Sequence, residues 1–313
     1  MIVRDRPSGF KMFLLLRGSI LPRILPSLLA TTLIATVVTM THGDLFALKI
    51  TLTTIPFSLI GLPLAIFLGF RNNAAYDRFW EGRKLWGELV HKSRSWSRQC
   101  QSLIAGEEPA HARLGLTDTR VRMVYRAIAF AHALRAHLRD AKAVPELQNL
   151  LLPAEWQQLG ASSNKPDFLM QQMGADLGQC LKDGRIDACL AASLDDTLSA
   201  LTAAAAGCER IKGTPIPFSY TLLLHRTAYL YCFLLPFGLV DTIGFMTPFV
   251  VAIVAYTFFG LDALGDEIEE PFGMDANDLP LDALCRAIEI NLRESLGDDP
   301  IPAPLAPVDF CLT

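Results

Sequence analysis

Four apolar stretches constrain the fold of this chain more than any other feature, because each is close to the ~20 residues that cross a bilayer as a helix. They cover residues 24–40, 50–70, 217–240 and 245–264. Of 313 residues, 51% are hydrophobic and only 19% are charged, which is too apolar for a typical soluble protein of this length. No alternating strand pattern is visible, so we expect an all-α polytopic membrane protein with four spanning helices.

Basic residues gather at one end of each stretch, and this predicts the orientation of the spans. They precede the first span, follow the second and precede the third: Arg4, Arg6, Lys11, Arg17, Arg23; Arg71, Arg78, Arg83, Lys84; Arg210, Lys212. The two short loops carry only Lys49. Both termini and the middle region are therefore expected in the cytoplasm, with the basic N-terminus retained and not cleaved as a signal peptide.

These patterns divide the chain into five parts. They are a cytoplasmic N-terminal segment at 1–23, two spans at 24–70, a cytoplasmic helical region at 71–214, two further spans at 215–264, and a cytoplasmic end at 265–313. Helical periodicity or composition predicts helices over 118–139, from 187 to about 208, and from 281 to about 296. A Pro-rich tail follows the last of these, and we expect it to be extended, either disordered or docked on a neighbour.

The second span has no visible end. Residues 62–86 read LPLAIFLGFRNNAAYDRFWEGRKLW, in which an apolar run turns charged without a proline or turn cluster between the two parts. We expect one helix to continue from the membrane into the cytoplasmic region.

Signals for an enzyme are weak. His132 and His137 are five residues apart, on different faces of a helix, and are best explained as solvated or core side chains. The seven cysteines are scattered without a CxxC pair, which predicts free thiols. With a net charge of only -4, nucleic acid is not an expected partner. We expect no enzyme and no required cofactor.

Two groups of polar residues leave alternatives open. His225 and Arg226 lie in the third apolar stretch, where an ionisable pair indicates either a helix portion outside lipid or a pore-lining or gating role. The acidic run after the fourth stretch contains Glu267, Glu270, Asp275 and Asp278. It is either a solvated acidic face or a site for a divalent cation such as Ca²⁺, although it does not match the EF-hand pattern.

Several motifs resemble the bacterial branch of the bestrophin family. They are RGS at 17–19, GLPLAIFLGFRNNAAYDRFWEGRKLWG at 61–87, IPFSYT at 216–221 and EPFG at 270–273. The resemblance implies a homopentameric ion channel in the bacterial inner membrane, with four membrane helices per subunit around one axial pore.

The resemblance also implies roles for individual residues. The neck residues, Leu62, Ile66 and Phe70, would form three apolar rings, since they match the family's pore-lining positions and lie on one helix face. Ile186 would form a second constriction at the cytoplasmic exit. Asn72 and Asn73 would be the first polar side chains of a wider vestibule below the neck.

We therefore expect a channel for monovalent ions that partners only with itself, lipid and its permeant ions. The bacterial branch and the acidic run favour cations such as sodium; the alternatives are an anion (chloride) channel of the same fold or a secondary transporter. The resemblance does not predict calcium activation, because Met274 and Ala276 interrupt the aspartate cluster that animal members carry.

Overall fold

A computed structural model describes residues 1–4, 9, 15–16, 18–42, 44–45, 48–49, 52–141 and 145–313. The basic residues Arg6, Lys11 and Arg17 and the expected start of the second span, Ile50, lie outside them. The chain divides into two compact units. The span unit is Asp5–Phe79 with Pro215–Glu270, and the bundle unit is Met1–Arg4, Trp80–Thr214 and Pro271–Thr313.

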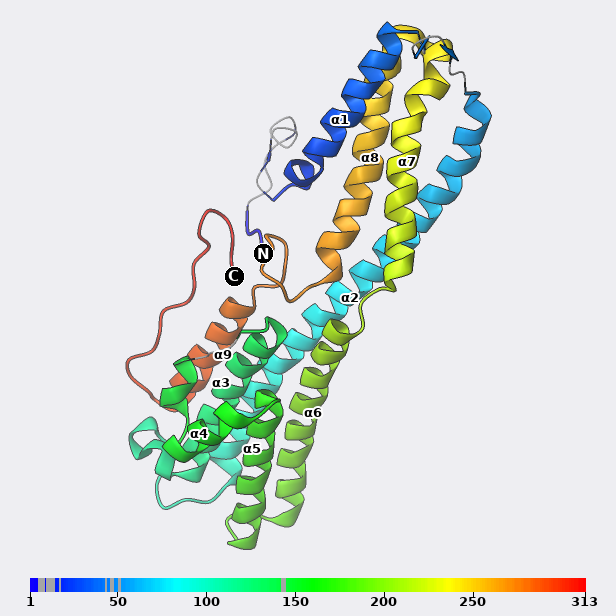
Figure 1. Cartoon of the computed structure of the whole chain (residues 1–313). Coiled ribbons are helices and arrows are strands. Elements are labelled where there is room, and N and C mark those ends of the chain that lie inside the picture. Colours follow the sequence, from blue (N-terminus) through cyan, green and yellow to red (C-terminus); the bar gives the residue numbers. More distant parts are fainter. Residues whose placement is uncertain are drawn as a thin grey trace. The chain divides into compact units, whose positions relative to one another are not determined.

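The apolar stretches form the helices of the span unit. These are α1 (Leu21–Met40), the first part of α2 (Thr54–Leu103), α7 (Phe218–Ile243) and α8 (Thr247–Glu269). Helix α8 packs against both α1 and α7, and the three lie side by side (Figure 1). In the described residues, three helical stretches are long and apolar enough to cross a membrane, and the third of them runs through both α7 and α8.

Local chemistry explains where these helices begin and turn. Helix α1 starts at Leu21, earlier than expected, because Pro22 fits the first turn of a helix, where its missing N–H costs no hydrogen bond. Between α7 and α8 the short 3-10 helix η4 (Gly244–Met246) begins at a positive φ of 50° that glycine adopts without strain. Threonine hydroxyls of α1 donate hydrogen bonds to carbonyls of the preceding turn, as Thr31 does to Ser27. Their polar atoms are thereby satisfied inside an apolar helix.

Helix α2 is continuous over 50 residues, which confirms the expectation of one unbroken helix through residues 62–86. Its residues up to Phe79 belong to the span unit and those from Trp80 to the bundle unit. The span unit therefore extends past residue 70, where the sequence suggested the cytoplasmic region would begin. The reason is that Arg71, Asn72 and Arg78 still bond to α8.

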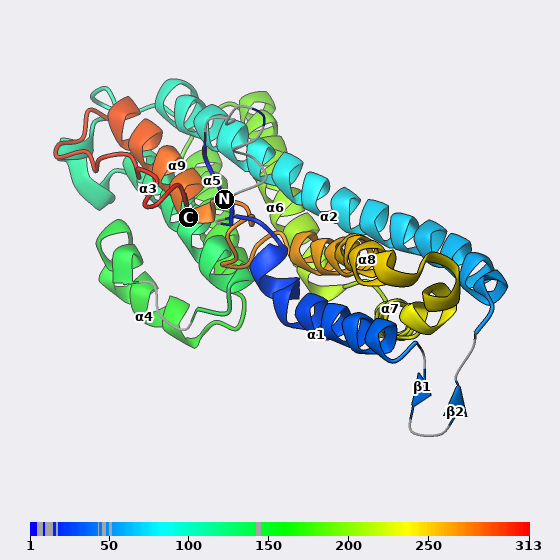
Figure 2. The same ribbon diagram turned by 90° about the horizontal axis from the view of Figure 1, so that it is seen from above.

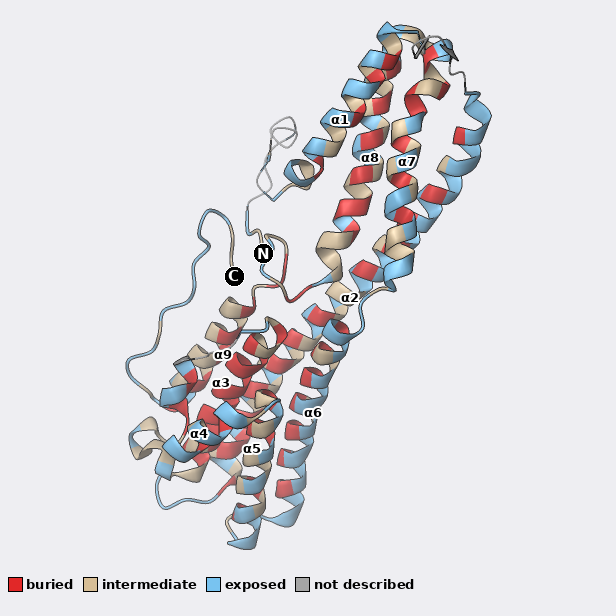
Figure 3. Cartoon of the chain, viewed as in Figure 1, coloured by how far each residue is buried: buried red, intermediate tan, exposed pale blue. Residues whose placement is uncertain are grey.

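The bundle unit is helical, as expected. It contains η2 (Ala112–Thr117), α3 (Thr119–Leu138), η3 (Pro145–Leu150), α4 (Pro153–Ala161), α5 (Lys165–Lys182), α6 (Ala188–Gly213) and α9 (Leu281–Ser295). Helix α3 lies at the centre, packed against α5 and α9 and buried along most of its length (Figure 3). Asp118 and Asp187 accept hydrogen bonds from the first N–H groups of α3 and α6, which fixes where both helices begin.

The C-terminal tail is docked and not disordered. Ala283 of α9 donates its N–H to the Thr313 carbonyl at 2.8 Å, and Val3 donates to the Phe310 carbonyl at 2.8 Å. An isolated bridge also pairs Ile2 with Cys311. Both chain ends are thereby tied to the bundle unit.

A short hairpin departs from the all-helical expectation. Strands β1 (Asp44–Leu45) and β2 (Leu48–Lys49) pair antiparallel between α1 and α2 (Figure 2). It was not expected, because two residues per strand are too few to show an alternating pattern.

The seven cysteines are free, as predicted, and most of them are buried. Burial raises the pKa of the Cys208 and Cys285 thiols to about 12. Neither thiol is therefore ionised near neutral pH.

Candidate functional site

The neck residues lie on an open face of α2. Leu62, Ile66 and Phe70 are 67%, 46% and 60% exposed. The opposite face of the helix is packed, since Leu64 and Leu68 are buried against α7. The three apolar side chains are thus free to meet lipid, water or another copy of the chain.

Small residues set how closely α2 and α7 approach. A Cβ added at Gly61 would lie 2.9 Å from the Tyr231 hydroxyl, and one at Gly238 would lie 2.4 Å from the Phe57 ring. Around Gly69, by contrast, nothing lies within 4 Å of such an atom. The backbone beside the neck residues is therefore open to a neighbour, whereas the side facing α7 is closely packed.

Directly after the neck, Arg71 forms a buried ionic cluster with α8. Its side chain is fully buried, and Nη1 donates to Asp262 Oδ1 at 2.9 Å and to the Asp262 carbonyl at 3.2 Å. Nη2 pairs with Asp266 and lies 3.8 Å from Glu269. Arg23 of α1 reaches the other oxygen of Asp266 at 3.7 Å. We call Arg71, Asp262, Asp266 and Glu269 the ionic cluster.

His225 of α7 joins this cluster. Its Nδ1 lies 2.6 Å from Asp262 Oδ2, and its ring stacks on Tyr229 with centroids 4.3 Å apart. The His225 side chain is 47% exposed, so one end of the cluster reaches the surface of the unit. Arg226 is exposed and makes no ion pair within the described residues. Of the pair His225 and Arg226, only His225 therefore belongs to the ionic cluster, whereas Arg226 remains exposed.

Asn72 and Asn73 differ in the same way. Asn72 donates its side-chain amide to the Leu261 carbonyl at 3.0 Å, and a Cβ at Gly265 would meet Asn72 Oδ1 at 2.5 Å. Asn72 therefore packs α2 onto α8, and its amide is not free to line a vestibule. Asn73 is exposed.

Sequence reasoning missed Asp262, which binds both Arg71 and His225. A signal was present, because a carboxylate near the end of an apolar stretch needs a buried partner. The chain has many basic residues, and the sequence did not show that the partner of Asp262 would be Arg71, 191 positions away.

Ile186 does not fit the aperture expected of it. Its side chain is only 6% exposed, and it lies in the turn between α5 and α6, next to the Asp187 cap. A constriction needs side chains that project into the pore, whereas this one is packed inside the bundle unit.

The four carboxylates named as a possible calcium site are divided between the units. Glu267 and Glu270 belong to the span unit, and Asp275 and Asp278 to the bundle unit. Asp278 is buried, and its Oδ2 accepts the N–H of Asp275 at 2.7 Å. The carboxylate therefore stabilises the turn to which it belongs. Within the residues that the structure describes, no three His, Cys, Asp or Glu side chains are grouped to hold a metal ion.

The acidic segment is not a uniformly solvated face either. Asp266 and Glu269 face Arg71, and Asp282 lies 2.8 Å from Arg135 and 2.6 Å from Arg139. Although burial opposes the change, the hydrogen bond from Arg139 and the charges of both arginines lower the pKa of Asp282. Part of the negative charge that favoured cations in the sequence is thus paired with arginines within each unit.

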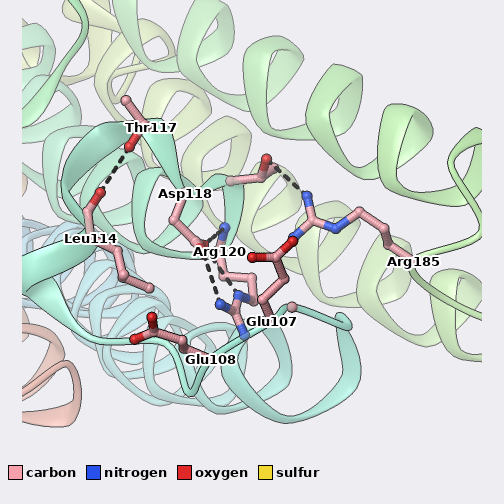
Figure 4. Close-up of a pocket in the computed structure, with 9 residues that line it drawn as sticks. Glu107, Glu108, Leu114, Thr117, Asp118, Arg120 and Arg185 are labelled. Carbon is pink, nitrogen blue, oxygen red and sulfur yellow. Dashed lines mark hydrogen bonds and ion pairs between the residues drawn. The ribbon is translucent and has the colours of Figure 1, made fainter.

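A polar pocket of about 340 Å³ lies beside the start of α3 in the bundle unit (Figure 4). Its arginines are already engaged. Arg120 forms a two-pronged pair with Asp118, and Arg185 donates to the Ala105 carbonyl and to Thr119. Glu107 and Glu108 add negative charge to the same pocket, so its positive charges are balanced by carboxylates of the protein itself.

Comparisons with known proteins agree over most of the chain. A family model described as bacterial/fungal bestrophin protein matches residues 1–294. The chain is 44% identical over 301 residues to a voltage-dependent anion channel-forming protein of Mesorhizobium japonicum, covering 96% of this chain and 94% of the relative. It is 41% identical over 309 residues to a protein of the same description from Salmonella typhi, with 98% of each chain covered.

Solved structures give the same result. A bacterial bestrophin homologue from Klebsiella pneumoniae, determined by Zn-SAD phasing, is 37% identical. It superposes with a TM-score of 0.80, covering 88% of this chain and 100% of the other.

Proposed function

The chain belongs to the bacterial and fungal bestrophin family, and from this premise we propose that it forms a membrane channel that conducts anions. The observation that carries the proposal is the whole-length match, at 41% identity or more, to relatives described as voltage-dependent anion channel-forming proteins. The family indicates a channel and not an enzyme, and channels of this family need no cofactor.

The cation preference expected from the sequence is not supported by these comparisons, which favour the anion alternative. The contacts give a physical reason to abandon it. The carboxylates of Asp266, Glu269 and Asp282 face arginines, which reduces their attraction for cations. The exposed guanidinium of Arg226, without an ion pair among the described residues, would favour anions beside the first half of α7.

In the membrane, we infer that α1, the first part of α2, α7 and α8 each cross the bilayer once. Four crossings are supported by the apolar lengths of these helices. Pro22 at the start of α1 and Gly244 between α7 and α8 mark where two of the helices begin. Both termini and the bundle unit would then lie in the cytoplasm of a bacterium, below its inner membrane, in agreement with the distribution of basic residues.

Conduction requires several copies of the chain, and we infer a homopentamer in which α2 lines the axis. The open face of α2 supports this role, because its neck residues are exposed while its other face is packed. Rings of Leu, Ile and Phe offer no ligand to replace an ion's hydration shell, so a narrow ring would exclude ions by dewetting and a wider one would pass them. Asn73, His225 and Arg226 would lie at the cytoplasmic side of this neck.

The ionic cluster would hold the neck in register. Arg71 follows Phe70 directly and is fixed to α8 by its bonds to Asp262. The lowest ring is thereby attached to a second membrane helix.

Reversal potentials test the proposal. Purified protein in planar bilayers with a gradient of NaCl should give single-channel currents whose reversal potential lies near that of chloride. A reversal potential near that of sodium would identify a cation channel of the same fold. Absence of current, or flux of two solutes in a fixed ratio, would instead indicate a transporter and contradict the proposal.

A further inference from the structure

A second cavity in the bundle unit differs from the polar pocket in its charge. It has a volume of about 490 Å³ and lies between the last part of α2 and α9. We call it the α2–α9 groove. Its polar lining is Arg94, Ser97, Arg98, Gln101, Ser102, Asn291 and Ser295.

Of the described residues, two arginines and no carboxylate line the α2–α9 groove. Arg98 is exposed, and its guanidinium has no bonding partner among the described residues. Arg94 uses only Nε, which donates to Asn291 Oδ1 at 2.8 Å. Two carboxylates of α9 lie near the groove but do not line it. Glu294 is exposed beside Ser295, and Glu289 is paired with Arg286 and Arg293 of its own helix. Among the described residues, the two arginines of this groove therefore form no ion pair with a carboxylate.

The hydroxyl hydrogens of the groove are already used. Ser295 donates to the Leu292 carbonyl at 2.7 Å, Ser97 and Ser295 share a bond of 2.7 Å, and Ser102 donates to the Arg98 carbonyl. Gln101 bonds both Ser97 and Ser295 through Nε2. These bonds join α2 to α9 and fix the walls of the groove.

What remains unused is a set of donors. They are the terminal nitrogens of Arg94, the guanidinium of Arg98 and the amide nitrogen of Asn291. Arginine's planar fork matches a phosphate or carboxylate with two parallel hydrogen bonds, and two forks suit a group that carries two negative charges. The volume lies in the range of sites for small metabolites and exceeds what an inorganic ion fills.

We propose that the α2–α9 groove binds a soluble phosphate monoester of metabolite size, with Arg94 and Arg98 holding the phosphate. The site lies in the bundle unit and goes beyond the channel activity, and its binding does not depend on conduction. The contrast with the polar pocket of Figure 4 supports the assignment, because there each arginine is already bonded within the protein.

Calorimetry on the purified full-length protein in detergent tests the site, with AMP, glucose 6-phosphate and inorganic phosphate as probes. We expect saturable binding of at least one monoester, tighter than that of inorganic phosphate. Arg98→Gln should weaken it at least tenfold and Arg98→Lys by less. The matched control is Arg185→Gln, which removes an arginine from the polar pocket and should leave the affinity unchanged.

Three results would overturn the proposal: no saturable binding of any monoester, wild-type affinity in Arg98→Gln, or an equal loss in Arg185→Gln. A lipid headgroup is the other source of such a phosphate. Vesicles containing phosphatidic acid should therefore fail to compete with the monoester, whereas binding of these vesicles alone would contradict a soluble ligand. Within the part of the chain that the structure describes, Arg98 makes no bond through its side chain, so unchanged melting of Arg98→Gln separates lost binding from lost folding.

Discussion

Arg71 of α2 and Asp262 of α8 form a buried ion pair, with Nη1 and Oδ1 2.9 Å apart and both side chains almost inaccessible to solvent. Removing water from two charges is costly, and only their mutual attraction and added hydrogen bonds offset the cost. Here the added bonds are the Asp262 carbonyl, which accepts from Arg71, and His225, which contacts the second carboxylate oxygen. The two residues therefore depend on each other.

Removing one partner should destabilise the protein strongly. In Arg71→Met, Asp262 stays buried without its cation, and we expect a loss of roughly 3–5 kcal/mol in the free energy of unfolding. Thermal unfolding in detergent would show it as a lower melting temperature. The control is Arg226→Met, an exposed arginine without an ion pair in the described residues, which should melt like the wild type.

A double variant separates charge from packing. Arg71→Met with Asp262→Leu removes both charges and should recover much of the stability lost in Arg71→Met alone. If the double variant is as unstable as the sum of the single ones, the pair is not coupled and the cluster has no special role.

Shortening a neck residue should widen the pore. Ile66→Ala removes three carbons from each copy, so a ring of alanines should hold water more easily and raise single-channel conductance severalfold. Leu33→Ala is the matched control, because Leu33 is an equally large, 65% exposed residue on α1, away from the proposed axis. Equal conductance in both variants and the wild type would indicate that the neck residues face lipid.

How much the sequence predicted depends on the range of the interactions involved. The limits of α3 and α9 were close to the observed ones, because the Asp118 cap and the apolar periodicity are local signals. The continuity of α2 followed equally from the absence of a break between Phe70 and Trp80.

Pairings between distant segments could not be predicted. Nothing near Asp262 in the sequence indicates Arg71 or His225. The tail is docked by backbone bonds to distant segments, such as those of Ala283 to Thr313 and of Val3 to Phe310. The assignment of Ile186 to an aperture depended on a thin local match, and its burial was not visible from residue type, since isoleucine is common both in cores and in apolar constrictions.

Calcium should have no effect on channel activity. Asp278 already accepts a hydrogen bond from Asp275 and is buried, and the described residues contain no group of three side chains suited to a metal. Open probability should therefore be the same in EGTA and in millimolar Ca²⁺. A response that disappears in Asp275→Asn would show instead that the acidic loop binds the ion.

Asp282 should make stability depend on pH at the acidic end. Its pKa is lowered because the bonds from Arg139 and Arg135 outweigh the effect of burial, so the carboxylate is stabilised in the folded state. Such a group stabilises the fold above its unfolded pKa of about 3.9, and this contribution is lost as the pH falls through the lower, folded value. Asp282→Asn should thus cost roughly 1–3 kcal/mol at pH 7, and its melting temperature should converge with that of the wild type below about pH 4. Asp195→Asn, at an exposed carboxylate of α6 without an ion pair in the described residues, serves as the control. A deficit in Asp282→Asn that stays constant down to pH 3 would mean that the side chain acts through its shape and not through its charge.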